Sequence, residues 1–199
     1  ADRVSRQATS ILHQPFSSAE IKGKMPEGYS EQWQASEQIS ADPLREWYSK
    51  EIWGQRASDD DSLFEVMSLQ VFQAGLTWRM VLSRRDGFRA AFAGWKIDDV
   101  AAMGPDDVRR LREDPGIIRN RQKIQAVIAN AGIVQGIQRE HGGFCRWFYD
   151  VLPGTDYPSL QKELRYTFKF MGPEISRMWL MASGRITRQE GDKYDPTVP

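Results

Sequence analysis

The chain has 199 residues and a mass of 22.9 kDa, with 40% hydrophobic and 27% charged residues. This length suits one compact domain or two small lobes sharing a core, and it excludes a marginal miniprotein and a large multidomain assembly. No apolar run approaches the roughly 18 residues of a membrane helix, and residues 1–10 lack the apolar core of a secretion signal. The single cysteine, Cys145, cannot close an internal disulfide. We therefore expect a soluble, cytoplasmic protein.

The net charge of zero conceals an uneven distribution. Residues 1–26 carry a charge of +2, residues 27–65 carry −7 and residues 66–199 carry +5. Within the basic part, Arg119 and Arg121 are followed by Lys123 with no acid between them. Such a stretch is either a solvated helix face or a surface that meets a polyanion.

The first helices are predicted from capping residues and helical spacing. Residues 1–41 are polar with isolated apolar anchors, and we interpret them as an extension that wraps the body. The body is expected to span residues 42–190, followed by a tail at 191–199. Asp42-Pro43 predicts a helix that runs to about residue 50. Asp61 is expected to cap the next helix, in which apolar residues recur up to Gly75.

The rest of the body is also predicted to be helical. Thr77 is expected to cap a helix that is interrupted at residues 85–87 before a short segment at 88–92. Further helices are predicted after Ile97 and after Pro105. The longest periodic run has Ile124, Val127, Ile128, Ala131, Val134 and Ile137 on one apolar face. Later helices are expected at 144–152, 159–166 and 173–183. Strand signals are nearly absent, so the fold is predicted to be all-α with eight to ten helices.

The short segment 167–172 connects two of these predicted helices. Its sequence, Thr-Phe-Lys-Phe-Met-Gly, fits a helix-hairpin-helix, in which backbone amides and the positive end of the second helix hold a DNA phosphate. Lys169 would add a mobile charge. The alternative is an ordinary helical hairpin whose Phe168 and Phe170 fill the core.

Aromatic residues bracket the helix that holds Gln70. They are Trp47, Tyr48, Trp53 and Trp78. Aromatic rings beside a buried amide suit a pocket for a flipped base, because a base offers two π faces and a hydrogen-bonding edge. The alternative is that these rings are core residues and that Gln70 is exposed.

Other chemistry is not indicated by the sequence. His13 and His141 have no partners at metal-ligand spacing, and no glycine-rich phosphate loop or nucleophile elbow is present. The cluster Asp59-Asp60-Asp61 fits a helix N-terminus better than a cation site. We expect no metal and no cofactor.

Three blocks in register resemble the DNA-3-methyladenine glycosylase I family. The first is Leu63-Phe64-Glu65-Val66-Met67-Ser68-Leu69-Gln70-Val71-Phe72-Gln73-Ala74-Gly75-Leu76-Thr77-Trp78, and the others are residues 116–124 and 168–172. Trp53-Gly54 matches as well. The resemblance covers about residues 42–186. It implies an all-α helix-hairpin-helix glycosylase fold, with two helical lobes around a base pocket.

The resemblance also implies an activity and a set of site residues. Members of this family act in base excision repair: they flip 3-methyladenine out of double-stranded DNA and hydrolyse its glycosidic bond. Methylation at N3 makes the base a good cationic leaving group, so the enzyme mainly selects, orients and desolvates it. No aspartate follows the hairpin helix where other superfamily members place a catalytic carboxylate. By resemblance, Tyr48, Trp53 and Trp78 hold the base, Gly75 and Leu76 approach the gap in the DNA, and Arg119, Arg121, Lys123, Lys169 and Gly172 grip phosphates.

Two features depart from the family pattern, the base-reading residue and the zinc ligands. Gln70 stands where the family has a glutamate that reads the base edge, and an amide carries no charge to stabilise a cationic lesion. The family's zinc ligands are replaced by Ser49, Gln189 and Lys193, so we expect no zinc clasp. The N-terminal extension, with anchors Phe16, Tyr29 and Trp33, is expected to replace that tie.

These departures leave two principal functions open. The first is a monofunctional glycosylase that binds DNA with an alkylated base as a monomer. The second is a DNA-binding or alkyl-base-sensing paralogue that kept the pocket but lost turnover. A structural paralogue without a role on DNA is a third, weaker alternative.

Overall fold

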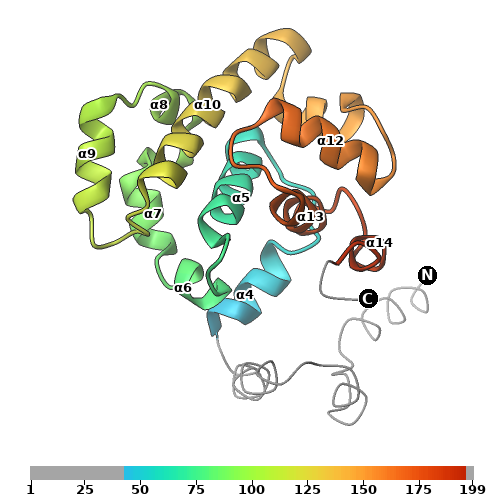
Figure 1. Ribbon diagram of the computed structural model, residues 1–199, viewed down its shortest axis with the longest axis horizontal. Coiled ribbons are helices and arrows are strands. Elements are labelled where there is room, and N and C mark those ends of the chain that lie inside the picture. Colours follow the sequence, from blue (N-terminus) through green and yellow to red (C-terminus); the bar gives the residue numbers. More distant parts are fainter. Residues whose placement is uncertain (1–42, 196–199) are drawn as a thin grey trace, which may run out of the picture. The chain divides into compact units, whose positions relative to one another are not determined.

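The computed structural model describes residues 43–195, and all regular structure in that range is helical (Figure 1). The all-α prediction is confirmed for this part of the chain. In chain order the elements are α4 (Pro43–Glu51), α5 (Asp60–Gln73), α6 (Trp78–Leu82), α7 (Arg85–Ala91), η3 (Ala93–Trp95), α8 (Ile97–Ala101), α9 (Pro105–Glu113), α10 (Arg121–His141), α11 (Phe144–Arg146), η4 (Trp147–Val151), α12 (Tyr157–Thr167), α13 (Pro173–Ala182) and α14 (Arg188–Asp192). Among these residues no helix is both long and apolar enough to cross a membrane.

Helix α5 is the central element of the body. Nine of its 14 residues are buried, and it contacts α6, α8, α10, α11 and α13. In Figure 1 the helices α6 to α9 lie on one side of α5, and α12 to α14 lie on the other. A helix buried on all sides is normally apolar. A polar residue among its buried positions, such as Gln70, therefore needs a specific explanation.

The start of α5 is set by a different aspartate from the one predicted. Asp59 is the N-cap, because its Oδ1 accepts a hydrogen bond of 2.8 Å from the backbone amide of Ser62. Asp61 lies in the first turn and accepts a hydrogen bond of 3.0 Å from the amide of Ile97 instead. The cluster of aspartates is thus used for capping and for ties to neighbouring elements, as expected of a helix start.

The break between α6 and α7 lies earlier than predicted. Thr77 caps α6 as expected, with its Oγ1 accepting from the amide of Met80. The turn then falls at residues 83–84, whereas residues 85–87 form the first turn of α7. Gly87 does not break the helix; its missing side chain admits the backbone of Gly116, since a Cβ on Gly87 would lie 2.2 Å from the carbonyl oxygen of Gly116.

The long helix α10 confirms the predicted apolar face. Its buried residues include Ile124, Val127, Ala131, Val134 and Ile137. The helix begins at Asn120, whose side chain accepts from the amide of Lys123, and it ends at Gly142, which has a left-handed φ of 75°. Helix α10 packs most extensively on α8 and also contacts α5, α9 and α11. It therefore connects α8 and α9 with α5 and α11.

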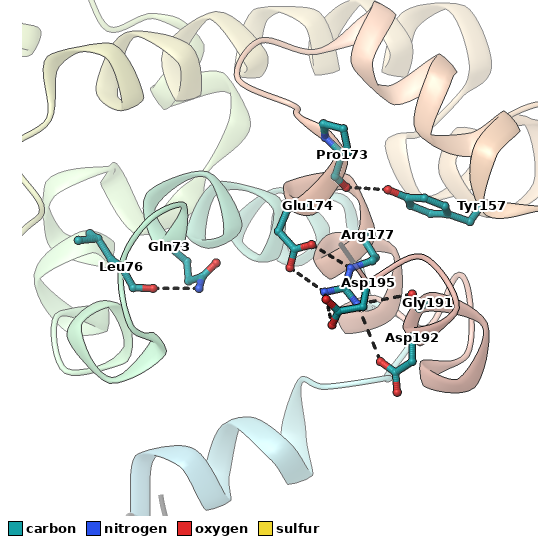
Figure 2. Close-up of polar contacts among 9 residues, drawn as sticks. All are labelled: Gln73, Leu76, Tyr157, Pro173, Glu174, Arg177, Gly191, Asp192 and Asp195. Carbon is teal, nitrogen blue, oxygen red and sulfur yellow. Dashed lines mark hydrogen bonds and ion pairs between the residues drawn. The ribbon is translucent and has the colours of Figure 1, made fainter. Parts of the chain in front are cut away.

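The C-terminal segment continues the folded body beyond the predicted boundary at residue 190. That boundary falls inside α14, a short helix without the apolar periodicity needed to predict it. Arg177 on α13 is only 5% exposed and donates hydrogen bonds to Glu174, to Asp195 and to the carbonyl of Gly191 (Figure 2). Residues 191–195 are thereby tied to α13. The extension at 1–41, with Phe16, Tyr29 and Trp33, lies outside the described residues.

Candidate functional site

Tyr48 contacts both Gln70 and Trp78, although the three side chains lie on three different helices. The Nε2 of Gln70 donates a hydrogen bond of 3.3 Å to the hydroxyl of Tyr48. The rings of Tyr48 and Trp78 have centroids 4.8 Å apart and planes inclined by 33°. Gln70 is 0% exposed, so the alternative of an exposed glutamine is wrong. Helices α4, α5 and α6 therefore bring together the three side chains that the resemblance assigned to base recognition.

The polar atoms of this group are incompletely paired. The Oε1 of Gln70 is buried and has no hydrogen-bond partner among the described residues. A buried acceptor without a partner is unfavourable, and a donor that enters the site would relieve it. Burial raises the pKa of Tyr48, with the hydrogen bond from Gln70 acting in the opposite direction. The phenol is thus neutral at physiological pH and is able to donate as well as accept.

Trp53 supports Tyr48 from the loop after α4. Its ring centroid lies 6.0 Å from that of Tyr48, and its amide donates a hydrogen bond of 2.9 Å to the Tyr48 carbonyl. The next residue, Gly54, has a φ of 74° and donates to the carbonyl of Ala182 at the end of α13. Trp53 is half-buried against the core. It is therefore positioned beside Tyr48 by contacts with two different helices.

A base does not fit between Tyr48 and Trp78 as these rings stand. A base stacked between two rings would hold them about 7 Å apart, twice the contact distance of about 3.5 Å. The observed centroid distance of 4.8 Å corresponds to direct contact between the rings. Entry of a base between them would therefore require Tyr48 or Trp78 to move.

A cavity of about 280 Å³ has Tyr48 in its lining. Its lining includes Tyr48, Trp47 and Glu65 but neither Gln70 nor Trp78. Arg85 lies 3.2 Å from the Glu65 carboxylate, and its guanidinium stands 4.2 Å from the centre of the Trp47 ring. Burial raises the pKa of Glu65, and the nearby charges of Arg85 and Arg89 oppose that rise. Tyr48 is the side chain shared by this cavity and the Gln70 group.

The loop between α5 and α6 presents Gly75 and Leu76. Gly75 is exposed and has a φ of 73°, a left-handed conformation that favours glycine. The loop is closed by Gln73, whose carbonyl accepts from the Leu76 amide at 2.7 Å. The Nε2 of Gln73 also donates to the Leu76 carbonyl at 3.0 Å (Figure 2). Both predicted residues thus lie on a braced turn next to Trp78.

The predicted basic stretch is only partly at the surface. Arg119 and Arg121 are exposed, as phosphate ligands require. Lys123 is 5% exposed, and its Nζ donates to the carbonyls of Phe72 and Ala74 at 2.8 and 2.6 Å. The prediction that Lys123 grips phosphate is therefore wrong. Its position beside Ile124 on the apolar face of α10 was a signal of burial, because Lys123 and Val127 are one turn apart.

The hairpin at residues 168–172 fits only in part the alternative in which both of its phenylalanines fill the core. Phe168 is buried in the core, whereas Phe170 is 38% exposed and has a left-handed φ of 58°. The side chain of Lys169 is exposed, and Gly172 precedes α13 at the N-cap position. Tyr157 donates a hydrogen bond of 2.8 Å to the carbonyl of Pro173 at the start of α13 (Figure 2).

Asn130 is a site residue that the sequence reasoning missed. It is fully buried on α10, its Oδ1 accepts from the amide of Lys169 at 2.8 Å, and its Nδ2 donates to the Lys169 carbonyl at 3.1 Å. This pair of bonds holds the hairpin backbone. A polar residue on the apolar face of α10, one turn from Val127 and Val134, was the signal that identifies it.

The residues at the family's zinc positions do not suit that metal. Ser49, Gln189 and Lys193 are all exposed, and a hydroxyl, an amide and an ammonium do not provide the thiolate and imidazole donors of structural zinc sites. Within residues 43–195, no group of three or more His, Cys, Asp or Glu side chains is arranged to hold a metal ion.

Comparison with known proteins identifies the family. The family model described as "Methyladenine glycosylase" matches residues 38–167. The chain belongs to the methyladenine glycosylase family. Among relatives in this family, the DNA-3-methyladenine glycosylase 1 of Escherichia coli (strain K12) is 47% identical over 168 residues, which cover 74% of this chain and 89% of that protein.

Solved structures of methyladenine glycosylases have the same fold. A crystal structure of 3-methyladenine DNA glycosylase I matches with a TM-score of 0.66 and 34% identity, covering 74% of this chain and 91% of that one. A structure on 3-methyladenine recognition by the Staphylococcus aureus protein matches with a TM-score of 0.66 and 28% identity over 80% of this chain and 93% of that one. The predicted helix-hairpin-helix glycosylase fold is thereby confirmed.

Proposed function

We propose that this chain is a monofunctional DNA N-glycosylase that acts as a monomer in the cytoplasm. It flips an N3-alkylated purine such as 3-methyladenine out of double-stranded DNA and hydrolyses the glycosidic bond as a step of base excision repair. The convergence of Tyr48, Gln70 and Trp78 carries this proposal. Relatives named for 3-methyladenine glycosylase activity support it.

Base recognition in this proposal uses the three converging side chains. Trp78 stacks on one face of the extruded base after Tyr48 and Trp78 separate. The unpartnered Oε1 of Gln70 accepts a hydrogen bond from the exocyclic amino group of adenine. The neutral hydroxyl of Tyr48 contributes a further donor or acceptor at the base edge.

Bond cleavage needs little chemistry from the protein. Water attacks C1′ of the deoxyribose, the bond from C1′ to N9 breaks with its electron pair moving to the base, and the water proton passes to solvent. Because N3 methylation makes the base cationic, it leaves as a neutral molecule. Helix α13 contains one acidic residue, Glu174, which is bound by Arg177. This supports a mechanism in which selection and desolvation of the base provide most of the rate.

DNA is held in this proposal from three elements. Arg119 and Arg121 at the start of α10 meet phosphates, and the hairpin with Lys169 and Gly172 meets another. The turn with Leu76 enters the stack where the nucleotide has left. The exposure of the three basic side chains supports this assignment.

Gln70 favours a second candidate function. A carboxylate next to a cationic base would add about 1–3 kcal/mol over a neutral partner, and this chain lacks it. A protein with Tyr48 and Trp78 in place but without that charge would still bind DNA and sense an alkylated base while turning over slowly or not at all.

One assay distinguishes the two candidates. Duplex DNA methylated with dimethyl sulfate is incubated with wild type, Gln70→Glu, Trp78→Phe and Trp78→Ala, and released 3-methyladenine is measured under single-turnover conditions. Release by wild type supports the glycosylase, and release by Gln70→Glu alone supports the sensor. Trp78→Phe is the matched control, because it keeps an aromatic face that Trp78→Ala removes. If no variant binds DNA at low salt, both candidates are wrong.

A further inference from the structure

Lys123 occupies a position that neither family resemblance nor phosphate binding explains. Its Nζ donates to the carbonyls of Phe72 and Ala74, at the C-terminal end of α5. The last carbonyls of a helix lack partners within the helix and carry its negative dipole end. A buried ammonium at this point therefore caps α5 with two charge-assisted hydrogen bonds. Burial lowers the pKa of Lys123, because desolvation disfavours its charged form.

The cap lies between two parts of the proposed site. One is the base group, which consists of Tyr48, Gln70 and Trp78, and the other is the Gly75–Leu76 turn. Gln70 precedes the capped carbonyls of Phe72 and Ala74 by two and four residues, and Gly75 and Leu76 follow directly. The local bonds between Gln73 and Leu76 close the turn on itself but do not attach it to the rest of the body (Figure 2). The bond from Lys123 to the Ala74 carbonyl provides that attachment.

Lys123 also belongs to the element that presents the phosphate-facing arginines. It lies in the first turn of α10, where its amide binds the Asn120 cap, two residues after the exposed Arg121. The Nζ stands 6.0 Å from the centre of the Phe170 ring in the hairpin. The Lys123 side chain thus reaches from the basic turn, which carries Arg119 and Arg121, to the α5–α6 turn. It also lies beside the hairpin.

We infer that Lys123 is a positioning residue for base extrusion: it holds the Gly75–Leu76 turn in register with the basic turn at Arg119 and Arg121. Phosphates bound at the basic turn then place Leu76 at the base step that must open. This inference rests on the proposed function. It assigns Lys123 no contact with DNA, since its ammonium is buried among protein carbonyls.

The test separates extrusion from DNA affinity. Duplex DNA with 2-aminopurine next to an alkylated or abasic site reports extrusion by fluorescence, and titrations between about 50 and 200 mM salt report phosphate contacts. Lys123→Met is expected to lower the extrusion signal or rate at saturating DNA on the order of 30-fold or more, because two charge-assisted bonds are lost. The salt slope of DNA binding is expected to stay unchanged. Arg121→Met is expected to reduce the salt slope by about 1 with less effect at saturation. Lys162→Met, an exposed change on α12, is the matched control for removing a lysine charge.

Each result supports or overturns the inference. A reduced salt slope with normal extrusion at saturation would show that Lys123 is a phosphate ligand, and normal values of both would show that it positions nothing. Extrusion does not require bond cleavage, so a wild type that releases no base would contradict the proposed function without affecting this test. If Lys123→Met does not fold, Lys123→Arg is measured in the same two assays, since it keeps the charge but changes its reach.

Discussion

The side-chain amide of Gln70 donates a hydrogen bond to the hydroxyl of Tyr48 over 3.3 Å, and both groups lie in the core. At that length the bond is weak, and the amide oxygen on the other side of the same group has no partner among the described residues. A polar group kept in the most buried helix with so little compensation contributes little to stability. A buried polar side chain with so few partners is typical of a binding residue rather than of a core residue.

Gln70→Met is therefore expected to affect recognition far more than stability. Methionine keeps the length of the side chain and removes both polar atoms, so the free energy of unfolding should change by less than about 1 kcal/mol. Binding of free 3-methyladenine, measured by quenching of tryptophan fluorescence, should weaken by on the order of tenfold or more. A loss of stability above about 2 kcal/mol with unchanged base affinity would identify Gln70 as a structural residue.

Asn130 is expected to control the hairpin through its two bonds to the Lys169 backbone. Asn130→Asp keeps the acceptor for the Lys169 amide but places a carboxylate oxygen against the Lys169 carbonyl, so stability should fall by about 2–4 kcal/mol and DNA affinity should fall with it. Lys169→Ala is the contrasting variant, because its side chain is exposed. Lys169→Ala should lower DNA affinity and the salt slope of binding. Its free energy of unfolding, measured by urea denaturation, should remain within about 0.5 kcal/mol of wild type.

If Asn130→Asp unfolds at the wild-type urea concentration, the buried bonds to the hairpin do not contribute as the geometry indicates. An equal loss of DNA affinity in both variants, without a difference in stability, would likewise show that the hairpin holds its conformation without Asn130.

The sequence predicted most elements of the fold but fewer of the contacts at the site. Helix α10 was predicted because burial of one face imposes a period on its residues, and the base group was assigned by resemblance. Lys123 and Asn130 were interpreted wrongly or missed, although both interrupt that apolar face. Their partners are backbone atoms distant in sequence, at Phe72, Ala74 and Lys169, and such pairings are set by tertiary packing. Gly87 was interpreted as part of a helix break, because its contact with the backbone of Gly116 is also set by tertiary packing.

Gly87→Ala is expected to disturb the segment that leads to the basic turn. A Cβ at this position would lie 2.2 Å from the carbonyl oxygen and 2.9 Å from the carbonyl carbon of Gly116, so backbone must move. The gain of about 1 kcal/mol in helix propensity is outweighed by the clash, and the net loss of stability should be about 1–3 kcal/mol. Weaker DNA binding should accompany it, because Arg119 follows Gly116 by three residues.

Gly132→Ala is the matched control for Gly87→Ala. Gly132 lies within α10, and a Cβ there would meet no atom within 4 Å. Thermal denaturation should show this variant stabilised by up to about 1 kcal/mol. If both alanine variants were equally stable relative to wild type, the contact between Gly87 and Gly116 would not constrain the fold.

Arg177→Met is expected to release the C-terminal segment from α13. The guanidinium is 5% exposed and pairs with Glu174 at 2.8 Å and with Asp195 at 3.2 Å, so its removal should cost about 2–3 kcal/mol. Arg188→Met, which breaks an exposed pair with Asp192, should change stability by less than about 0.5 kcal/mol. EDTA should leave the melting temperature of wild type unchanged, because this tie uses no metal. Equal effects of the two arginine changes, or a lower melting temperature in EDTA, would contradict this account.

Asp60 is expected to make the fold sensitive to acid. Burial alone would raise the pKa of this carboxyl, but hydrogen bonds from the Cys145 amide, the Gln138 side chain and the Phe144 amide lower it below its usual value. A carboxyl with a lowered folded pKa stabilises the protein above its unfolded pKa of about 3.9, and this contribution is lost as the pH falls through the folded value.

Asp60→Asn tests this acid sensitivity by comparison with wild type across pH. Asparagine turns an NH₂ group toward donors, so the variant should be less stable by about 1–3 kcal/mol at pH 7. The difference between the two proteins in urea denaturation should shrink as the pH falls below about 4, because the wild-type carboxyl becomes protonated. Asp99→Asn, a change at an exposed position on α8, is the control, and its stability in urea denaturation should match that of wild type. A difference between wild type and Asp60→Asn that stays constant down to pH 3 would show that the charge of Asp60 is not what stabilises the junction of α5 with α10 and α11.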